Sequence, residues 1–86
     1  MKQSKEPQLT LNVRSATKTE YKGLAHTITS INETGVFDIL PTHANFISII
    51  KNYIVIDKGL PSQKEIKLET GVLTVSRNKV DVYLGF

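Results

Sequence analysis

The stretch GVFDILPTHANF, residues 35–46, sets strand-forming residues around a proline and a histidine. Its first half, VFDIL, has the apolar and β-branched residues that are typical of a strand. Pro41 has no N–H to donate to a sheet ladder, so we expect it to end that strand. The PTHAN segment then turns the chain, and FISII begins the next strand. The sequence therefore predicts a corner between two strands at residues 41–45.

His43 is the residue of this corner with the most chemistry to offer. Its imidazole carries a donor and an acceptor, which can satisfy backbone groups of the turn. A contact with another protein at the same corner is compatible with that role. Asp38, His43 and Ser48 have the side-chain types of a hydrolase triad, but no nucleophile elbow accompanies them. We therefore predict no catalytic residue and no enzyme activity in this chain.

Strand patterns continue on both sides of the corner. The segments LTLNV (9–13), EIKLE (65–69) and VLTVS (72–76) place apolar residues at every second position. This alternation is typical of a half-buried strand. The segment ISIIKNYIVID (47–57) has apolar residues at both odd and even positions, which predicts a strand covered on both faces.

The fold predicted from these patterns is all-β, because no amphipathic helical segment of normal length occurs. Glycines at positions 23, 35, 59, 71 and 85 leave several gaps of 12 to 14 residues. Such spacing is typical of a two-sheet antiparallel β-sandwich, or flattened barrel, of roughly eight to ten short strands. We expect no C-terminal helical hairpin. The predicted core residues are Leu9, Leu11, Val13, Ile28, Ile39, Leu40, Ile47, Ile54, Ile56, Leu68, Leu73, Val75, Val80 and Val82.

The composition is that of one ordinary globular domain. The chain has 86 residues, of which 40% are hydrophobic and 22% charged, and it has no cysteine. The expected organisation is a flexible tail at residues 1–8 and a single sandwich domain at residues 9–86. The tail lacks the apolar core of a signal peptide, and no apolar run approaches the ~20 residues that span a bilayer. We therefore expect a cytosolic chain without direct membrane insertion.

Charge and aromatic residues argue against a nucleic-acid partner. The net charge is +3, yet no two basic residues are adjacent, and KEIKLE (64–69) interleaves lysine with glutamate. Such interleaving is typical of a solvated face. Small basic OB-like folds bind single strands on stacking aromatics, whereas Phe37, Phe46 and Tyr53 occur in apolar strand context.

No cofactor, metal ion or small-molecule ligand is predicted. The only histidines are His26 and His43, and no carboxylates are spaced with them as metal ligands. The chain also has no glycine-rich loop of the kind that cradles phosphates.

NETGVFDILPTHANFISII, residues 32–50, resembles the signature of the N-terminal domain of the ε subunit of F-type ATP synthases, called δ in mitochondria. That signature is a glycine loop, an apolar strand ending in ILP, the motif P-x-H-A and a further strand. Residues 9–31 resemble the family's opening strands, with Gly23 at their bend, and residues 65–84 resemble its closing strands. The resemblance covers roughly residues 9 to 84.

Four features depart from the family's pattern. Thr42 replaces a residue that is commonly glycine, and Thr70-Gly71 replaces a double glycine. Val36 follows the loop glycine, where a polar or acidic residue is common. The family's two-helix C-terminal domain does not occur in these 86 residues.

The resemblance implies a non-catalytic component of the central stalk, or rotor, of a proton-translocating ATP synthase. Such a subunit docks on the γ subunit and the c-ring and couples proton flow to ATP synthesis. The implied location is cytoplasmic, peripheral to the inner (plasma) membrane through the complex. The candidate γ contact is Pro41, Thr42, His43, Ala44 and Asn45. The candidate c-ring contact is Asn32, Glu33, Thr34, Gly35 and Val36.

The resemblance also bears on nucleotide binding, and one alternative to it stays open. Without the inhibitory helical domain, the chain is expected neither to bind ATP appreciably nor to inhibit hydrolysis. The alternative is a free-standing β-sandwich that binds another protein and is not incorporated in a synthase.

Overall fold

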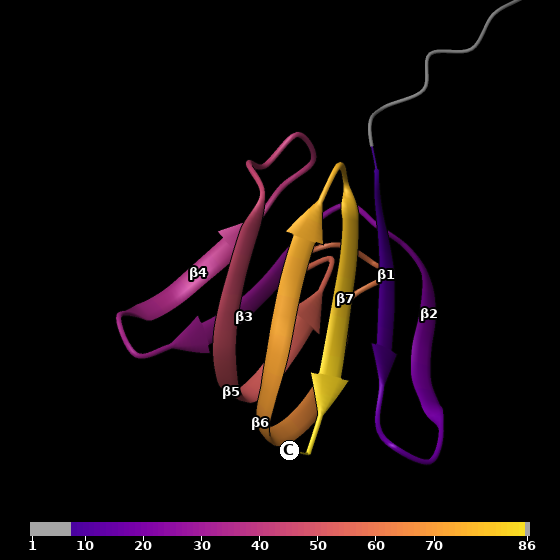
Figure 1. Ribbon diagram of the computed structural model, residues 1–86. Coiled ribbons are helices and arrows are strands. Elements are labelled where there is room, and N and C mark those ends of the chain that lie inside the picture. Colours follow the sequence, from indigo (N-terminus) through magenta and orange to yellow (C-terminus); the bar gives the residue numbers. More distant parts are fainter. Residues whose placement is uncertain (1–7, 86) are drawn as a thin grey trace, which may run out of the picture.

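The computed structural model describes residues 8–85, and these form seven β-strands and no helix (Figure 1). The strands are β1 (Leu9–Arg14), β2 (Thr19–Ala25), β3 (Ile28–Asn32), β4 (Gly35–Ile39), β5 (Phe46–Ile56), β6 (Lys64–Ser76) and β7 (Lys79–Leu84). The all-β prediction is confirmed. The count is below the predicted roughly eight to ten, because β5 and β6 are single strands of 11 and 13 residues. The predicted tail lies outside the described residues, apart from Gln8.

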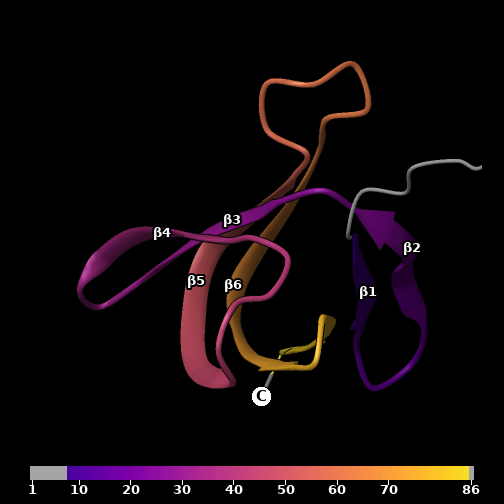
Figure 2. The ribbon, with the colours of Figure 1, turned by 90° about the horizontal axis from the view of Figure 1, so that it is seen from above.

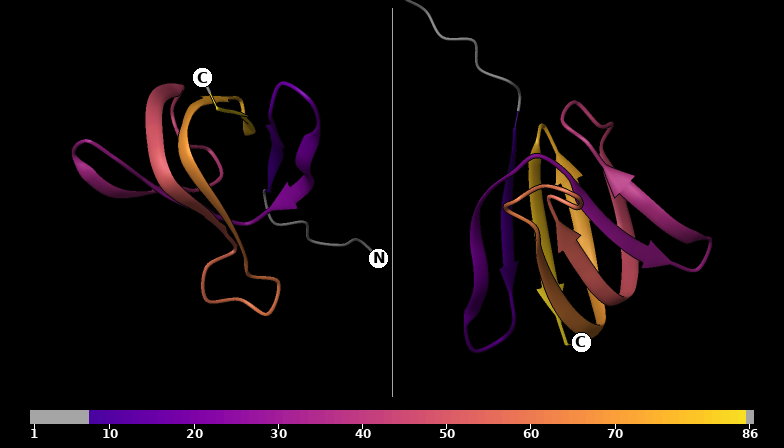
Figure 3. Two further views of the ribbon diagram at one scale, coloured as in Figure 1. Left: turned by 90° about the horizontal axis from the view of Figure 1, so that it is seen from below. Right: turned by 180° about the vertical axis from the view of Figure 1, so that it is seen from behind.

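The seven strands form one continuous sheet in the order β2-β1-β7-β6-β5-β3-β4. Neighbouring strands pair antiparallel, except that β1 and β7 run parallel. Seen from above and below, the sheet curls so that β1 and β2 lie on one side of the molecule and β5 and β6 on the other (Figures 2 and 3). One curled sheet therefore supplies both layers of the sandwich, where two antiparallel sheets were expected.

A bulge interrupts the pairing of β5 with β6. Lys51 pairs with Thr70, whereas Asn52 pairs with Leu68, so Glu69 has no partner. One extra residue reverses the alternation of a strand's side chains and bends the strand. In β6, Ile66 and Leu68 are accordingly more buried than their neighbours before Glu69, and odd-numbered positions are the buried ones after it. The bulge lets one long strand contribute to two parts of the core.

The core is a single cluster of apolar side chains from all seven strands. Its members are Leu9, Leu11, Val13, Ala25, Ile28, Ile39, Ile50, Ile54, Ile56, Leu73, Val75, Val80 and Val82. Most of the predicted core is confirmed, and Leu68 packs against the cluster half-buried.

Two predicted core residues are wrong, and two core residues were missed. Leu40 and Ile47 are 52% and 70% exposed, whereas Ala25 and Ile50 are buried. The first half of β5 is covered on one face only, because Ile49 is also 61% exposed. The prediction that this strand is covered on both faces is therefore wrong for residues 47–50.

Candidate docking surfaces

The corner at residues 41–45 joins the end of β4 to the start of β5. The backbone N–H of His43 donates to the carbonyl of Leu40 at 3.1 Å, which closes a turn directly after the strand. Thr42 lies inside this turn with φ of 69°, an angle that glycine adopts without steric cost and a β-branched residue does not. The departure from glycine at position 42 therefore leaves the turn in place, with strain at one residue.

The imidazole of His43 is part of the corner's internal bonding. Its Nδ1 lies 2.7 Å from the carbonyl oxygen of Ala44, and because a carbonyl can only accept, Nδ1 carries the proton. The ring also packs edge-on against Phe46, with centroids 5.5 Å apart, and Phe46 in turn contacts Phe37 at 5.6 Å. His43 is thereby half-buried and held in one orientation.

Asn78 connects this corner to the turn between β6 and β7. Its side-chain Oδ1 accepts a hydrogen bond of 2.7 Å from the backbone N–H of Thr42. Its backbone carbonyl accepts one of 2.8 Å from the N–H of Thr10 in β1. Arg77 and Asn78 have φ of 52° and 64°, as a two-residue hairpin turn requires. The sequence analysis missed Asn78, whose only local signal is that asparagine tolerates the left-handed φ of a turn.

The second candidate surface is the turn at residues 32–36, between β3 and β4. The side-chain oxygen of Asn32 accepts hydrogen bonds from the N–H and the hydroxyl of Thr34, at 2.9 and 2.8 Å. Gly35 follows with φ of 125°. Glu33 and Val36 are exposed, and Val36 keeps 60% of its surface accessible. The exposed side chains of this turn are thus a carboxylate, the hydroxyl-bearing Thr34 and one apolar group.

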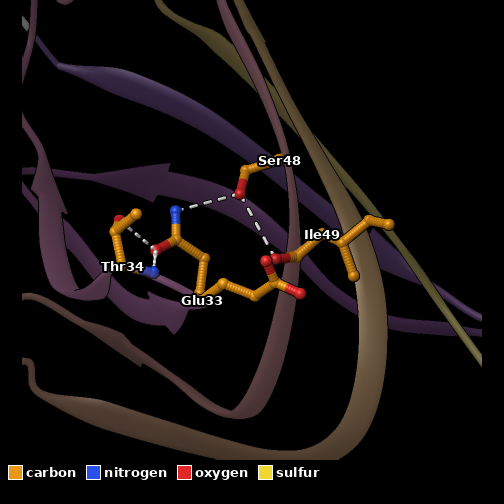
Figure 4. Close-up of a pocket in the computed structure, with 5 residues that line it drawn as sticks. Glu33, Thr34, Ser48 and Ile49 are labelled. Atoms are coloured by element: carbon orange, nitrogen blue, oxygen red, sulfur yellow. Dashed lines mark hydrogen bonds between the residues drawn. The ribbon is translucent and has the colours of Figure 1, made fainter.

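The amide of Asn32 also fastens this turn to β5. It donates to the hydroxyl of Ser48 at 3.0 Å (Figure 4). The turn and β5 border a hollow of about 290 Å³, lined by Asn32, Glu33, Thr34, Ser48 and Ile49. Of the candidate residues, this hollow includes three from the turn and none from the corner.

The structure does not bring the two candidate surfaces together. They lie at opposite ends of β4, with the corner beyond Ile39 and the turn reaching into the strand only as far as Val36 (Figure 1). A strand of this length spans on the order of 16 Å. A partner at one surface can therefore be distinct from a partner at the other.

The hypothetical triad is not assembled either. Asp38 accepts a hydrogen bond from Thr29 at 2.5 Å, His43 bonds Ala44, and Ser48 bonds Asn32. No hydrogen bond in the described residues joins Asp38, His43 and Ser48 to one another. Residues 8–85 also hold no cluster of three potential metal ligands.

A buried carboxylate lies outside both candidate surfaces. Asp57 is 5% exposed, and its carboxylate accepts hydrogen bonds from the N–H groups of His26 and Thr27, at 2.6 and 3.3 Å. The hydroxyl of Ser62 donates a further bond of 2.7 Å. Burial raises the pKa of Asp57, but these bonds, with a smaller contribution from His26, outweigh it and leave the pKa below its usual value. Asp57 thus ties the β2–β3 connection to the β5–β6 loop.

Comparison with known proteins identifies the domain. The family described as "ATP synthase, Delta/Epsilon chain, beta-sandwich domain" matches residues 8–84. No curated protein sequence matches the chain. No helix that could cross a membrane is present in the described part of the chain.

Two solved structures share the fold. One is a chain of the Euglena gracilis mitochondrial ATP synthase OSCP/F1/c-ring structure, with a TM-score of 0.82 at 13% identity. The other belongs to the Tetrahymena thermophila mitochondrial ATP synthase central stalk/c-ring, with a TM-score of 0.74 at 12% identity. The matches cover 95% and 96% of this chain but 53% and 67% of those chains, so this chain spans about half the length of the first. With nearly every described residue inside one family's domain, this chain belongs to the ATP synthase delta/epsilon family.

Proposed function

We propose that this chain is a non-catalytic stalk component of a proton-translocating ATP synthase that docks on the γ subunit and the c-ring. The family match over residues 8–84 carries this proposal. In that role the chain is peripheral to the membrane on its cytoplasmic side and helps couple proton flow to ATP synthesis. These residues neither bind ATP appreciably nor inhibit its hydrolysis.

The two candidate surfaces suit a part that connects two partners. We assign the corner, residues 41–45, to γ and the turn, residues 32–36, to the ring. Both are fastened to other segments by hydrogen bonds that involve side chains. The N–H of Thr42 donates to Asn78 in the β6–β7 turn, and the amide of Asn32 donates to Ser48 in β5. A loop that is held at both ends by a rigid sheet can transmit force with little loss of position. The exposed Val36 supplies an apolar contact for the ring.

Single-cysteine variants test this assignment, because the chain has no cysteine of its own. Ala44→Cys labels the corner and Val36→Cys labels the turn, and both positions are exposed. Each variant is assembled with a synthase core that has been stripped of its ε subunit, and a short photocrosslinker is attached to the thiol. Ala44→Cys should crosslink to γ and Val36→Cys to a ring subunit. ATP hydrolysis of the core should not fall.

Lys58→Cys, in the exposed β5–β6 loop, is the matched control. It should give neither product. Crosslinks from the control alone would overturn the assignment of the surfaces. Failure of the chain to associate with the core at all would favour the free-standing binding module.

A further inference from the structure

The first half of β5 has a neighbouring strand on one side only. β6 pairs with β5 from Phe46 to Ile56, whereas β3 pairs with it only from Lys51 to Ile56. Residues 46–50 therefore have no strand neighbour on the side where β3 diverges from β5, and we call them a free edge. The side chain of Asn32 reaches this edge at one point, the hydroxyl of Ser48. Such an edge presents backbone donors and acceptors that another strand can bind.

The hydrogen bonds of β6 show which way its backbone groups point. The carbonyl of Thr70 accepts a bond of 3.1 Å from the N–H of Gly85, directly after β7. Successive residues of a strand in an antiparallel sheet direct their N–H and C=O groups to opposite neighbours. Even-numbered residues of β6 from Thr70 onward thus bond β7, and Gly71, Leu73 and Val75 bond β5.

The partners of those residues in β5 are Ile50, Ser48 and Phe46. The residues between them, Ile47 and Ile49, consequently direct both backbone groups away from β6, toward the free edge. The carbonyl of Ile49 accepts one hydrogen bond of 3.2 Å from the hydroxyl of Ser48, which leaves its second lone pair for an incoming N–H. Two N–H donors and two carbonyl acceptors line this edge at a spacing that an added strand matches.

The side chains of the same two residues are exposed. Ile47 and Ile49 keep 70% and 61% of their surface accessible, and both lie on the outer face of the sheet. Edge strands usually carry charged or bulged residues that discourage pairing. Here the free backbone groups and the exposed apolar groups belong to the same residues, so one added strand would cover both.

One carboxylate, that of Glu33, lies beside this edge. Glu33 lines the hollow together with Ser48 and Ile49, and its side chain reaches toward β5 (Figure 4). No basic side chain of the described residues lies within ion-pair distance of its carboxylate. A lysine or arginine on an incoming strand would supply the missing charge.

We propose that residues 46–50 of β5 accept an extended segment of a partner protein as an added strand. The segment alternates apolar residues, which pack on Ile47 and Ile49, with a lysine or arginine that faces Glu33. Main-chain hydrogen bonds hold such a segment, and the alternating side chains select it. This inference does not rest on the stalk function, and either can fail without the other. Glu33 belongs to both surfaces, so the added strand and the ring would compete for that side chain.

The test uses the full chain and a capped peptide of about seven residues that alternates valine with lysine and threonine. Binding is followed by NMR amide shifts and by hydrogen exchange. At saturation the Ile47 and Ile49 amides should exchange at least about tenfold more slowly. A peptide with glutamate in place of lysine should bind more weakly. Glu33→Gln should weaken the lysine peptide about two- to fivefold and remove most of its preference over the glutamate peptide.

Two edge variants complete the test. Ile47→Pro removes one edge N–H that no ladder bond uses, and Ile49→Lys places a like charge beside the peptide. Each should abolish measurable binding at about 1 mM peptide, while Leu24→Thr, exposed on β2, should bind as the parent does. If Ile47→Pro does not fold, Ile49→Lys alone decides. Unchanged binding in these variants, shifts on the β2 edge, self-association of the chain without peptide uptake, or no binding would each overturn the proposal.

Discussion

Oδ1 of Asn78 accepts the backbone N–H of Thr42 at 2.7 Å, across 36 positions of sequence. The contact joins the turn between β6 and β7 to the corner between β4 and β5. It satisfies a backbone donor at the one corner residue with a strained φ. A residue outside residues 41–45 therefore helps to hold the candidate γ surface in place.

Asn78→Ala should lower the free energy of unfolding by about 1–2 kcal/mol, because it orphans the Thr42 N–H and puts alanine at a left-handed φ. Asn78→Gly removes the same hydrogen bond, but glycine adopts a left-handed φ without steric cost. It should therefore lower the free energy of unfolding by less than Asn78→Ala does. Urea unfolding measures both. Arg77→Gly, at the neighbouring left-handed position, is the control and should be close to neutral. Equal stability of all three variants and the parent would show that the bond contributes nothing.

His43→Ala should cost about 1–2 kcal/mol of unfolding free energy, since it removes the bond to the Ala44 carbonyl and the edge contact with Phe46. Thermal and urea unfolding check this value. Ala44→Ser, at an exposed position of the same corner, should leave stability unchanged. A stable His43→Ala variant that binds γ less well would mean that the imidazole acts only as a surface contact. No change in either property would leave the corner without a role for His43.

Asp57 should make stability depend on acid pH. Its pKa is lower in the folded chain than in the unfolded one, so its contribution is complete above the unfolded pKa of roughly 4. That contribution is lost as pH falls through the folded pKa. Asp57→Asn should therefore be less stable at pH 7 by about 1–3 kcal/mol, the scale of bonds to a charged acceptor. The difference from the parent should narrow toward pH 3.

The measurement for Asp57 is the urea midpoint at a series of pH values. Asp81→Asn is the control. In the described residues, the Asp81 carboxyl takes part in no hydrogen bond, whereas that of Asp57 accepts three. A parent and an Asp57→Asn variant with parallel pH profiles would contradict the assignment.

Gly71→Ala should destabilise the sheet by about 1–3 kcal/mol through overpacking. A Cβ at this position would lie 2.9 Å from the backbone carbonyl oxygen of Tyr83 and 3.3 Å from a methyl of Leu84. Gly23→Ala is the matched control, because its nearest neighbour is the movable hydroxyl of Tyr21 at 3.4 Å. Differential scanning calorimetry of both variants separates the two cases. A melting temperature of Gly71→Ala equal to that of Gly23→Ala would refute the close approach.

The sequence predicted the class of fold because its alternation is strong in β1, β6 and β7. The sequence could not show which alternate side chains of β5 face the core, because Ile47, Ile49 and Ile50 are equally apolar. The buried side of β5 depends on which residues of its neighbour β6 face inward. In β6 that side changes at Glu69, which has no partner in β5. Nothing local distinguishes this glutamate from the other charges of KEIKLE.

The candidate surfaces were only partly accessible to the same reasoning. Pro41 and Gly35 mark the corner and the turn by their backbone restrictions, which are local properties. Asn78 and Asp57 act on segments at least 30 positions away, so no local pattern reports their partners. The free edge beside Ile47 likewise depends on where β3 leaves β5.

The parallel pairing of β1 with β7 has a consequence for how the protein is made. Thr10 pairs with Lys79 and Arg14 with Tyr83, so the first strand has its place in the sheet beside the last. Before residues 79–84 have left the ribosome, β1 lacks its neighbour β7 and can pair only with β2. The apolar face of this β1–β2 hairpin is then unprotected. Folding of such non-local sheets is slow. During synthesis that exposed apolar face can aggregate or bind a chaperone.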